Sequence, residues 1–236
     1  MTATTPRPRY GKDVKTIGAA WRLWTAKRSP RILATGLLVA IVLRAVLGDF
    51  SWRDLAAVAA MLVVYPFGEW AIHVYLLHLK PFRWRGREVE LPTAASHRMH
   101  HEAPHDLNMI VFAPVEAVAM LLVVVPVVVA AICALVGLAF GAVPIGVALT
   151  GVVTAYALIL AYEWTHFLIH TAYQPRSRYY RSIWRTHRLH HFKNERYWHG
   201  ITNTVSDRVL GTFPDQRSVP RSPTCLLYTS PSPRDS

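Results

Sequence analysis

Histidines dominate the chemistry available to this chain, and they occur in two copies of one pattern. The first copy contains EWAIHVYLLH at 69–78 and SHRMHH at 96–101. The second contains EWTHFLIH at 163–170 and THRLHH at 186–191. Ten of the twelve histidines of the chain lie in these four segments. Because imidazole nitrogen is a ligand for iron, zinc, copper and nickel, the repeated clustering predicts a metal site.

Helix geometry predicts how the histidines of each segment act together. His166 and His170 are four residues apart and therefore share one face of a helix. Each HX2HH segment places three histidines at i, i+3 and i+4, which are also expected to share a face. His73 and His78 are five residues apart, so they need a widened turn, or two metals on adjacent sides, to act together. Ser96 and Thr186 are expected to be the N-caps of the two short HX2HH helices.

Ten imidazoles exceed what one ion can bind, because tetrahedral zinc takes about four ligands and an octahedral ion about six. Two ions with about five ligands each would use all ten. Ring nitrogens bind metal only when they are deprotonated, so any activity that depends on the metal should fall in acid. The expected metal ligands are His73, His78, His97, His100, His101, His166, His170, His187, His190 and His191.

Two carboxylates and two further histidines are candidates for a supporting role beside the metals. Glu69 and Glu163 lie about one helical turn before the first histidine of their segments. Each is expected to accept an imidazole N–H and so to orient a ligand. His105 and His199 lie outside the clusters, where a lone histidine is more often a hydrogen-bonded structural residue than a ligand.

The composition indicates a membrane protein. Of the 236 residues, 52% are hydrophobic and 17% are charged, whereas soluble domains carry about 25% charged residues. Apolar stretches at 32–48, 54–79, 115–140 and 143–171 are candidates to cross a bilayer, which takes roughly 20 residues in a helix. We therefore expect an all-α integral membrane fold. Arg44, near the end of the first stretch, should snorkel, and Pro126 in the third predicts a kink.

The second and fourth apolar stretches are longer than a bilayer requires. At about 1.5 Å per residue, both exceed the roughly 30 Å apolar thickness, so their C-terminal ends should project from the membrane. Those ends carry His73 and His78 in one stretch and His166 and His170 in the other. We therefore expect the histidines to form a dimetal site in a helical cap beside the membrane.

Loop charge predicts the orientation in the membrane. Lys and Arg are concentrated in the N-terminal segment, in 80–113 and after 171, whereas the turn at 49–53 has one Arg and the turn at 141–146 has none. By the positive-inside rule, both termini and the long loop are cytoplasmic. All four histidine segments then lie on the cytoplasmic side of a multi-pass protein, which would occupy the inner membrane of a bacterial cell.

The net charge of +12 does not predict nucleic-acid binding, because the Lys and Arg residues flank apolar runs. Residues 1–31 predict a basic amphipathic helix at the membrane surface, with Ile17, Trp21 and Trp24 at helical spacing. We expect no cleavable signal peptide. The membrane domain is expected over 32–214, and the segment 225–236 resembles the translation of a sequencing adapter.

The ordered motifs HX4H (73–78), HX2HH (97–101), HX3H (166–170) and HX2HH (187–191) resemble those of the fatty acid hydroxylase / sterol desaturase superfamily. Within it, the chain resembles the fatty acid 2-hydroxylase branch, in a bacterial-type form. The resemblance covers about 60–214 and includes HGITNTVSDRVLGTFPD at 199–215.

The resemblance implies a non-haem dimetal enzyme that uses O2 to hydroxylate a C–H bond of a lipid. The substrate would be fatty acyl or sphingolipid-like, and the ten clustered histidines would be the ligands. Iron is favoured where a site activates oxygen beside a lipid, although zinc could occupy the same ligands. Residues 1–31 are too short for a cytochrome b5 domain, so the electrons are expected from a separate ferredoxin or cytochrome b5.

Two alternatives remain open at this stage. The same site could desaturate a lipid or oxidise a sterol methyl group. A metal transporter or di-haem electron carrier is a different class. Haem would need histidines facing each other across helices at membrane depth, and a transporter would need a polar path through the apolar stretches. Neither feature is evident in the sequence.

Overall fold

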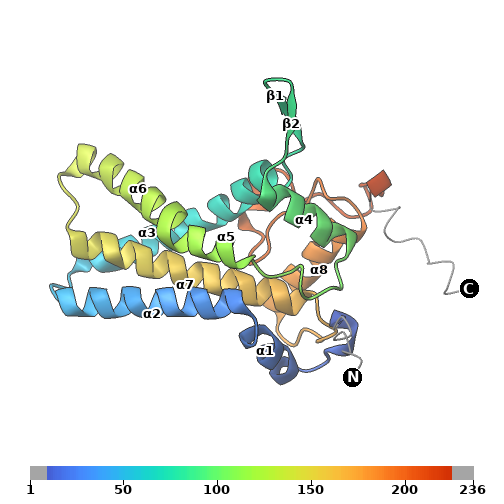
Figure 1. Cartoon of the computed structure of the whole chain (residues 1–236), viewed down its shortest axis with the longest axis horizontal. Coiled ribbons are helices and arrows are strands. Elements are labelled where there is room, and N and C mark those ends of the chain that lie inside the picture. Colours follow the sequence, from blue (N-terminus) through green and yellow to red (C-terminus); the bar gives the residue numbers. More distant parts are fainter. Residues whose placement is uncertain (1–9, 225–236) are drawn as a thin grey trace, which may run out of the picture. The chain divides into compact units, whose positions relative to one another are not determined.

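The computed structural model describes residues 10–224, and almost all of its regular structure is helical (Figure 1). The segment expected to be adapter-derived, 225–236, lies outside the described residues. The elements are η1 (Gly11–Asp13), α1 (Ile17–Thr25), α2 (Arg28–Leu47), α3 (Trp52–Ala71), η2 (Ile72–Leu77), β1 (Phe82–Trp84), β2 (Arg87–Val89), α4 (Pro92–Glu102), α5 (Pro114–Ala119), η3 (Met120–Val124), α6 (Val125–Phe140), α7 (Ile145–Ile169), α8 (Arg178–Phe192) and α9 (Val205–Val209).

Four helical segments are long and apolar enough to cross a membrane: Arg28–Leu47, Trp52–Leu77, Pro114–Phe140 and Ile145–Ile169. They coincide within a few residues with the four apolar stretches, which confirms the predicted all-α fold with four candidate spans. The second span comprises α3 and η2, and the third comprises α5, η3 and α6.

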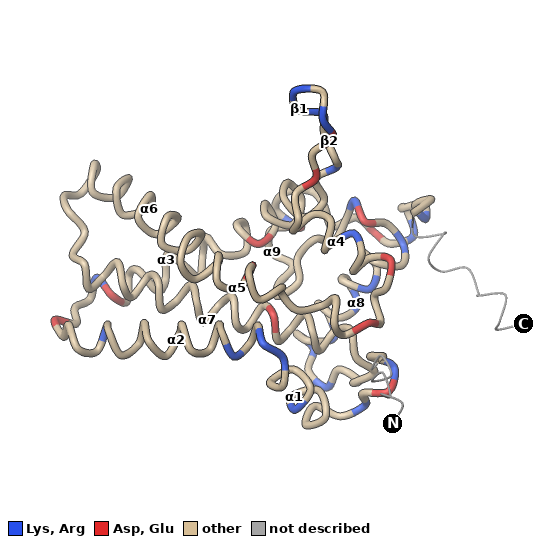
Figure 2. Tube along the Cα trace, viewed as in Figure 1, with Lys and Arg blue, Asp and Glu red and all other residues tan. Residues whose placement is uncertain are grey.

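The chain forms two compact units. The apolar unit contains residues 22–68 and 111–164, and therefore most of the four spans. In the described chain, the histidine unit contains 10–21, 69–110 and 165–224. Lys and Arg are sparse along α2, α6 and α7 and frequent around α8 and the β1–β2 hairpin (Figure 2).

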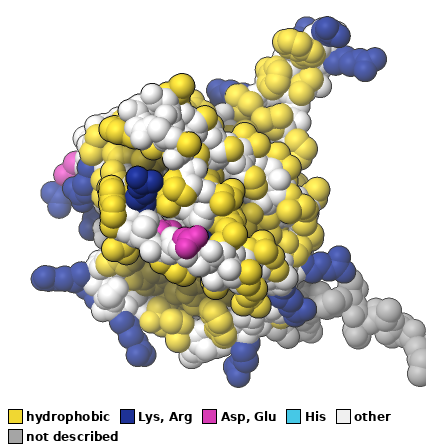
Figure 3. All heavy atoms as spheres, turned by 90° about the vertical axis from the view of Figure 1, so that its left-hand side faces the viewer, with side chains coloured by type: hydrophobic (Ala, Val, Ile, Leu, Met, Phe, Trp, Pro, Cys, Tyr) yellow, Lys and Arg dark blue, Asp and Glu magenta, His cyan; other side chains and the backbone are white. Residues whose placement is uncertain are grey.

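The apolar unit has a small core and a hydrophobic exterior. Leu33, Leu121 and Tyr156 belong to the core that α2, α5, η3, α6 and α7 form. By contrast, Leu122 is 72% exposed and Leu138 is 86% exposed. The face at the α2–α3 and α6–α7 turns shows many hydrophobic side chains, with a few basic and acidic ones between them (Figure 3). Apolar side chains on an outer surface of this extent are suited to a lipid environment.

Arg44 does not snorkel to the surface, contrary to the prediction from sequence. Its side chain is buried and pairs with Asp54, with 2.6 Å between Nη2 and Oδ1. Its Nε also donates to the Thr150 hydroxyl at 2.8 Å, and its Nη1 donates to the Gly48 carbonyl. The short α2–α3 turn brings the carboxylate within reach, so the guanidinium is neutralised inside the unit and need not extend to water.

Replacing Asp54 by Asn should therefore destabilise the apolar unit. The variant leaves a buried guanidinium without its counter-charge, which costs roughly 3–5 kcal/mol. Thr150→Val is the matched control, because it keeps the counter-charge and removes only the hydroxyl that accepts from Arg44 and donates to Asp54, so it should cost less, about 1.5–3 kcal/mol. Denaturation in detergent measures both changes, and equal stabilities of the two variants would contradict the assignment.

The sequence predicts a kink at Pro126, and the structure has a π-helical turn directly before this proline. The segment Met120–Val124 is a π-helix in which the Val125 N–H bonds to the Met120 carbonyl, five residues back. A proline lacks the N–H for an α-helical bond, and its ring collides with the carbonyl four residues earlier. The widened turn relieves this conflict by changing the hydrogen-bond register ahead of Pro126.

The helix starts in the histidine unit differ from the predicted ones. α4 begins at Pro92, and α8 begins after Ser177, whose hydroxyl accepts the Tyr180 N–H at 3.0 Å. Ser96 and Thr186 therefore lie inside these helices and are not N-caps. Proline at the first helical position and serine at the N-cap are both strong start signals, so they set the boundaries earlier than the histidine motifs.

Residues 1–31 were expected to form an amphipathic helix; 1–9 lie outside the described residues, and the rest includes α1 (Ile17–Thr25), whose apolar residues differ in exposure. Ile17 and Trp21 are exposed, whereas Trp24 is buried. The Trp24 indole N–H donates to Glu163 Oε2 at 3.2 Å within the apolar unit. Only part of the expected apolar face is therefore available to contact a membrane surface.

Candidate metal centre

The ten clustered histidines come together as two groups of five, all within the histidine unit. Within each group, the potential ligand atoms lie within 4.8 Å of one another. Eight of the ten residues are buried, and His78 and His101 are partly exposed. Group A consists of His73, His78, His97, His101 and His190. Group B consists of His100, His166, His170, His187 and His191.

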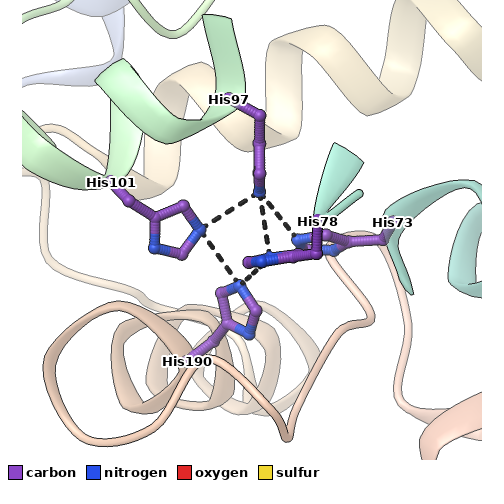
Figure 4. Close-up of side chains that lie close together, drawn as sticks. All are labelled: His73, His78, His97, His101 and His190. Carbon is purple, nitrogen blue, oxygen red and sulfur yellow. Dashed lines mark hydrogen bonds between the residues drawn. The ribbon is translucent and has the colours of Figure 1, made fainter. Parts of the chain in front are cut away.

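The rings of group A point their Nε2 atoms toward a common centre (Figure 4). His97 Nε2 lies 3.2 Å from His73 Nε2 and 3.1 Å from His101 Nε2. His190 Nε2 lies 3.1 Å from His78 Nε2 and 3.2 Å from His101 Nε2. Three elements of the histidine unit supply these rings: η2, with its C-terminal His78, then α4 and α8.

Group B is arranged around His187 in the same way. The Nε2 atom of His187 lies 3.1 Å from that of His166 and 3.0 Å from that of His170. His191 Nε2 is also 3.0 Å away. His100 completes the group, with its ring centroid 4.5 Å from that of His170.

The two groups exchange one histidine between the two sequence copies. His100 belongs to the first copy but lies in group B, and His190 belongs to the second copy but lies in group A. Each is the middle histidine of an HX2HH segment. At about 100° per residue, positions i and i+4 lie about 40° apart, and i+3 lies about 60° to the other side of i. The three histidines of each segment were expected to share one face. In the structure, the outer pair joins one group and the middle residue joins the other.

A widened turn accommodates the five-residue spacing of His73 and His78. This is one of the two arrangements that the sequence allowed. Residues Ile72–Leu77 form the π-helix η2, and the His78 N–H bonds to the His73 carbonyl at 3.2 Å. A π-helical turn closes between i and i+5, so it brings these two positions onto one face. Their rings stack with centroids 5.1 Å apart.

Backbone carbonyls orient rings in both groups. Nδ1 lies 2.5 Å from the His199 carbonyl in His73, 2.8 Å from the Pro104 carbonyl in His170, and 2.8 Å from the Tyr197 carbonyl in His190. A carbonyl oxygen only accepts, so each Nδ1 must carry the proton. In the neutral ring this leaves a lone pair on Nε2, the atom that faces the group.

This arrangement fits metal ions. Lone pairs that face each other at about 3 Å repel unless a cation lies between them. The observed 3.0–3.2 Å between neighbouring Nε2 atoms matches ligands about 90° apart on an ion with bonds of about 2.1 Å. His100 gives a second indication: it is 1% exposed, and neither ring nitrogen has a hydrogen-bond partner within residues 10–224. Ligation would satisfy one of these buried nitrogens.

Burial keeps the rings neutral. It is the main cause that lowers the pKa of His97, His100 and His187 well below 6.5, and nearby imidazoles lower these pKa values further. The pKa of His78 falls to about 4, again chiefly through burial. Each cationic ring would lose its hydration and repel its neighbours. The ligand nitrogens are therefore unprotonated at neutral pH.

Glu69 stabilises the loop that supports group A. Its Oε1 accepts the N–H groups of Ile201 and of Thr202, the latter at 2.9 Å, and its Oε2 accepts the Thr202 hydroxyl. This loop includes His199, whose carbonyl lies at His73 Nδ1. Glu69 was expected to accept an imidazole N–H and so orient a ligand. In the structure it acts on His73 indirectly, by holding the loop whose His199 carbonyl contacts the His73 ring.

Asp207, which was not predicted from the sequence to support the site, organises the other end of the same loop. It is fully buried and accepts the His199 N–H at 2.9 Å and the Gly200 N–H at 2.8 Å. It also accepts the Thr212 hydroxyl at 2.6 Å, and the Trp70 indole N–H donates to the same hydroxyl oxygen at 2.9 Å. An acidic residue inside the polar segment 199–215 was the available signal.

Glu163, His105 and His199 lie outside both groups. Glu163 is buried in the apolar unit and accepts hydrogen bonds from Trp24, Ser29 and the Phe112 N–H, not from an imidazole. The His105 ring stacks on Phe192, with centroids 5.8 Å apart. His199 acts through its backbone, since its carbonyl orients His73 while its ring Nε2 donates to the Arg196 carbonyl at 3.0 Å.

Comparison with known proteins finds relatives of this chain. The family model for fatty acid hydroxylase matches residues 58–212. The Fatty acid 2-hydroxylase of Rattus norvegicus is 26% identical over 160 residues, which are 68% of this chain and 40% of that protein. The Dihydroceramide fatty acyl 2-hydroxylase FAH2 of Arabidopsis thaliana is 28% identical over 156 residues, which are 65% of this chain and 61% of that protein.

The aligned part of the chain thus spans between 40% and 61% of the length of these curated relatives. A solved structure of full-length Scs7p, in which only the hydroxylase domain is visible, has a TM-score of 0.47 and 19% identity, and the match covers 88% of this chain and 70% of that one. The family match extends over well more than half of the chain and includes all four histidine segments, so this chain belongs to the fatty acid hydroxylase family.

Proposed function

We propose that this chain is a multi-pass membrane oxygenase that uses O2 to hydroxylate a C–H bond of a fatty acyl or sphingolipid-like substrate. The observation that carries the proposal is the pair of five-imidazole groups in a chain of the fatty acid hydroxylase family. The relatives are both named as 2-hydroxylases, which supports carbon 2 of an acyl chain as the position that is hydroxylated.

Groups A and B would each hold one metal ion, iron in the active protein, although zinc would fit the same ligands. When bound, the pair of iron ions would supply the activation of O2 that the insertion of one oxygen atom requires. The ring-nitrogen count supports this stoichiometry, because each group offers five ligands and leaves a position for a further ligand on a six-coordinate ion.

The chain's own residues would orient the ligands and keep them neutral. The carbonyls of Pro104, Tyr197 and His199 hold the Nδ1 protons, so the Nε2 lone pairs stay turned inward. Burial disfavours protonation of the ligands at neutral pH. The rings also exclude water, since eight of the ten are buried. Held in this way, the ligands need little rearrangement to bind metal.

The same proposal includes a location and an electron source. The four apolar helices would cross the membrane, with both termini and the histidine unit on the cytoplasmic side according to the positive-inside rule. In a bacterial cell this is the inner membrane. Hydroxylation with O2 consumes electrons that imidazoles do not provide, so a separate ferredoxin or cytochrome b5 would be the donor.

Lipid mass spectrometry of cells expressing the chain tests this function. We expect lipids that are heavier by one oxygen atom in cells with the unmodified chain, and their loss in cells with His190→Ala. His105→Ala is the matched control, because its ring lies outside both groups. Products lacking two hydrogens would support desaturation instead. Identical lipids with the unmodified chain and His190→Ala would contradict an enzymatic role of this site.

A further inference from the structure

A pocket of about 730 Å³ lies in the histidine unit on the face of α8 opposite to its histidines. Arg178, Arg181 and Arg185 line one wall. They recur at i, i+3 and i+7, so they share one helical face. On an ideal helix, His187 and His190 point to the other side of the same helix. A pocket of this size is in the range of small-molecule sites, roughly 300–1,000 Å³.

The opposite wall adds two more arginines. Arg208 comes from α9, and its guanidinium lies 4.1 Å from the centroid of the Phe213 ring. Arg217 follows in the segment after α9. We call the site lined by these five arginines the arginine pocket. Its second wall reaches to Arg217 and therefore extends past the residues matched by the family model, which end at 212.

The second wall is fixed in place by hydrogen bonds that do not involve the arginines. The Trp198 N–H donates to the Thr212 carbonyl at 2.9 Å. The Lys193 ammonium donates to the Gln216 carbonyl, and the Asn194 side chain donates to the Pro220 carbonyl at 3.1 Å. The pocket is thus formed before any ligand binds, which reduces the entropic cost of binding.

The charges in the arginine pocket are not balanced within the described chain. Five arginines and one acidic residue, Asp215, line it, which leaves a formal charge of 5 − 1 = +4. The ion pairs found between residues 10 and 224 join Arg44 to Asp54 and Arg98 to Glu90, so none involves this pocket. Asp215 Oδ1 accepts the Arg217 backbone N–H at 2.7 Å. The five arginines are exposed, so water screens part of their mutual repulsion, and an anion in the pocket would lower the rest.

We propose that the arginine pocket binds a phosphate-bearing ligand. Guanidinium groups present paired N–H donors that match phosphate oxygens, and several of them can surround one phosphate. The hydroxyl of Ser182, which is exposed and also lines the pocket, adds a further donor. The phosphate has two possible sources, the head group of an anionic phospholipid and a soluble organic or inorganic phosphate. This proposal does not depend on the function of the histidine groups.

Binding to the full chain in detergent tests the proposal. Inorganic pyrophosphate, measured by titration calorimetry, is the soluble probe. Phosphatidic acid, compared with phosphatidylcholine by native mass spectrometry, is the lipid probe. We expect at least one of the two to bind. The double variant Arg178→Gln with Arg181→Gln should weaken that binding by on the order of tenfold or more for each lost guanidinium. Arg217→Gln should weaken it from the opposite wall.

The matched control is Arg83→Gln with Arg85→Gln, which removes the same charge from the exposed β1–β2 hairpin and its turn. The control should bind like the unmodified chain, and unchanged melting temperature and metal content should show that the variants fold. Binding of pyrophosphate alone assigns a soluble phosphate, and binding of phosphatidic acid alone assigns a lipid head group. Equal loss in the control, or no binding of either probe, would overturn the proposal. Binding of an acidic protein without binding of either probe would overturn it too.

Discussion

His190→Ala is expected to release the metal of group A while group B keeps its own. The residue comes from the second sequence copy, but its Nε2 lies 3.1 Å from that of His78 and 3.2 Å from that of His101. Loss of a ligand should weaken metal binding by more than the roughly 10- to 100-fold that loss of a supporting partner costs. After dialysis against a chelator, the metal content should fall from about two ions per chain to about one.

Double variants distinguish groups A and B from the simpler arrangement in which each sequence copy binds its own metal. His100→Ala with His78→Ala removes ligands from both groups, so both metals should be lost. If each sequence copy bound its own metal, the same pair would remove ligands from one site only. His190→Ala with His78→Ala gives the reverse test, since both ligands belong to group A. Elemental analysis by mass spectrometry measures each ratio, and one retained metal in His100→Ala with His78→Ala would contradict the grouping.

Asp207→Ala should have the second large effect, on both stability and metal binding. It leaves two buried donors without their acceptor, the N–H groups of His199 and Gly200, and it removes the acceptor of the partly buried Thr212 hydroxyl. Each such donor costs about 1–3 kcal/mol. The loop would shift, and the His199 carbonyl would no longer hold the proton of His73 Nδ1. We expect a loss of several kcal/mol in unfolding free energy, about 2 or more.

The metal content separates positioning from general destabilisation. Group A should bind its metal about 10- to 100-fold more weakly, because it contains His73, whereas group B has no ligand that depends on this loop carbonyl. Asp207→Asn keeps one carbonyl acceptor and should be affected less. Asp215→Asn is the control, since Asp215 is exposed and accepts from the Arg217 N–H. Equal loss of metal from both groups would show that Asp207 acts only on stability.

The sequence was sufficient for the features that depend on local periodicity. The four spans were predicted from apolar runs long enough to cross a bilayer. In the structure, the bounds of these spans differ from the predicted ones by only a few residues. The five-residue spacing of His73 and His78 already required a widened turn as one solution, and η2 is that turn. The membership of all ten histidines in one unit follows from motif spacing repeated along the chain.

Features that depend on tertiary contacts were not predictable. Which group His100 and His190 join is decided by the way α4 and α8 face each other, and motif spacing does not contain this information. Arg44 looked like a snorkelling residue because its partner, Asp54, lies across a turn in the next helix. The helix starts were missed for a different reason, since Pro92 and Ser177 precede the histidine motifs and compete with Ser96 and Thr186 as start signals.

Anomalous X-ray diffraction from the protein loaded with iron, recorded at the iron absorption edge, tests the central claim most directly. The account predicts two peaks of anomalous density for each chain. One peak should lie among the Nε2 atoms of group A and the other among those of group B. A single peak, or peaks away from these nitrogens, would contradict a centre built from two groups of five histidines.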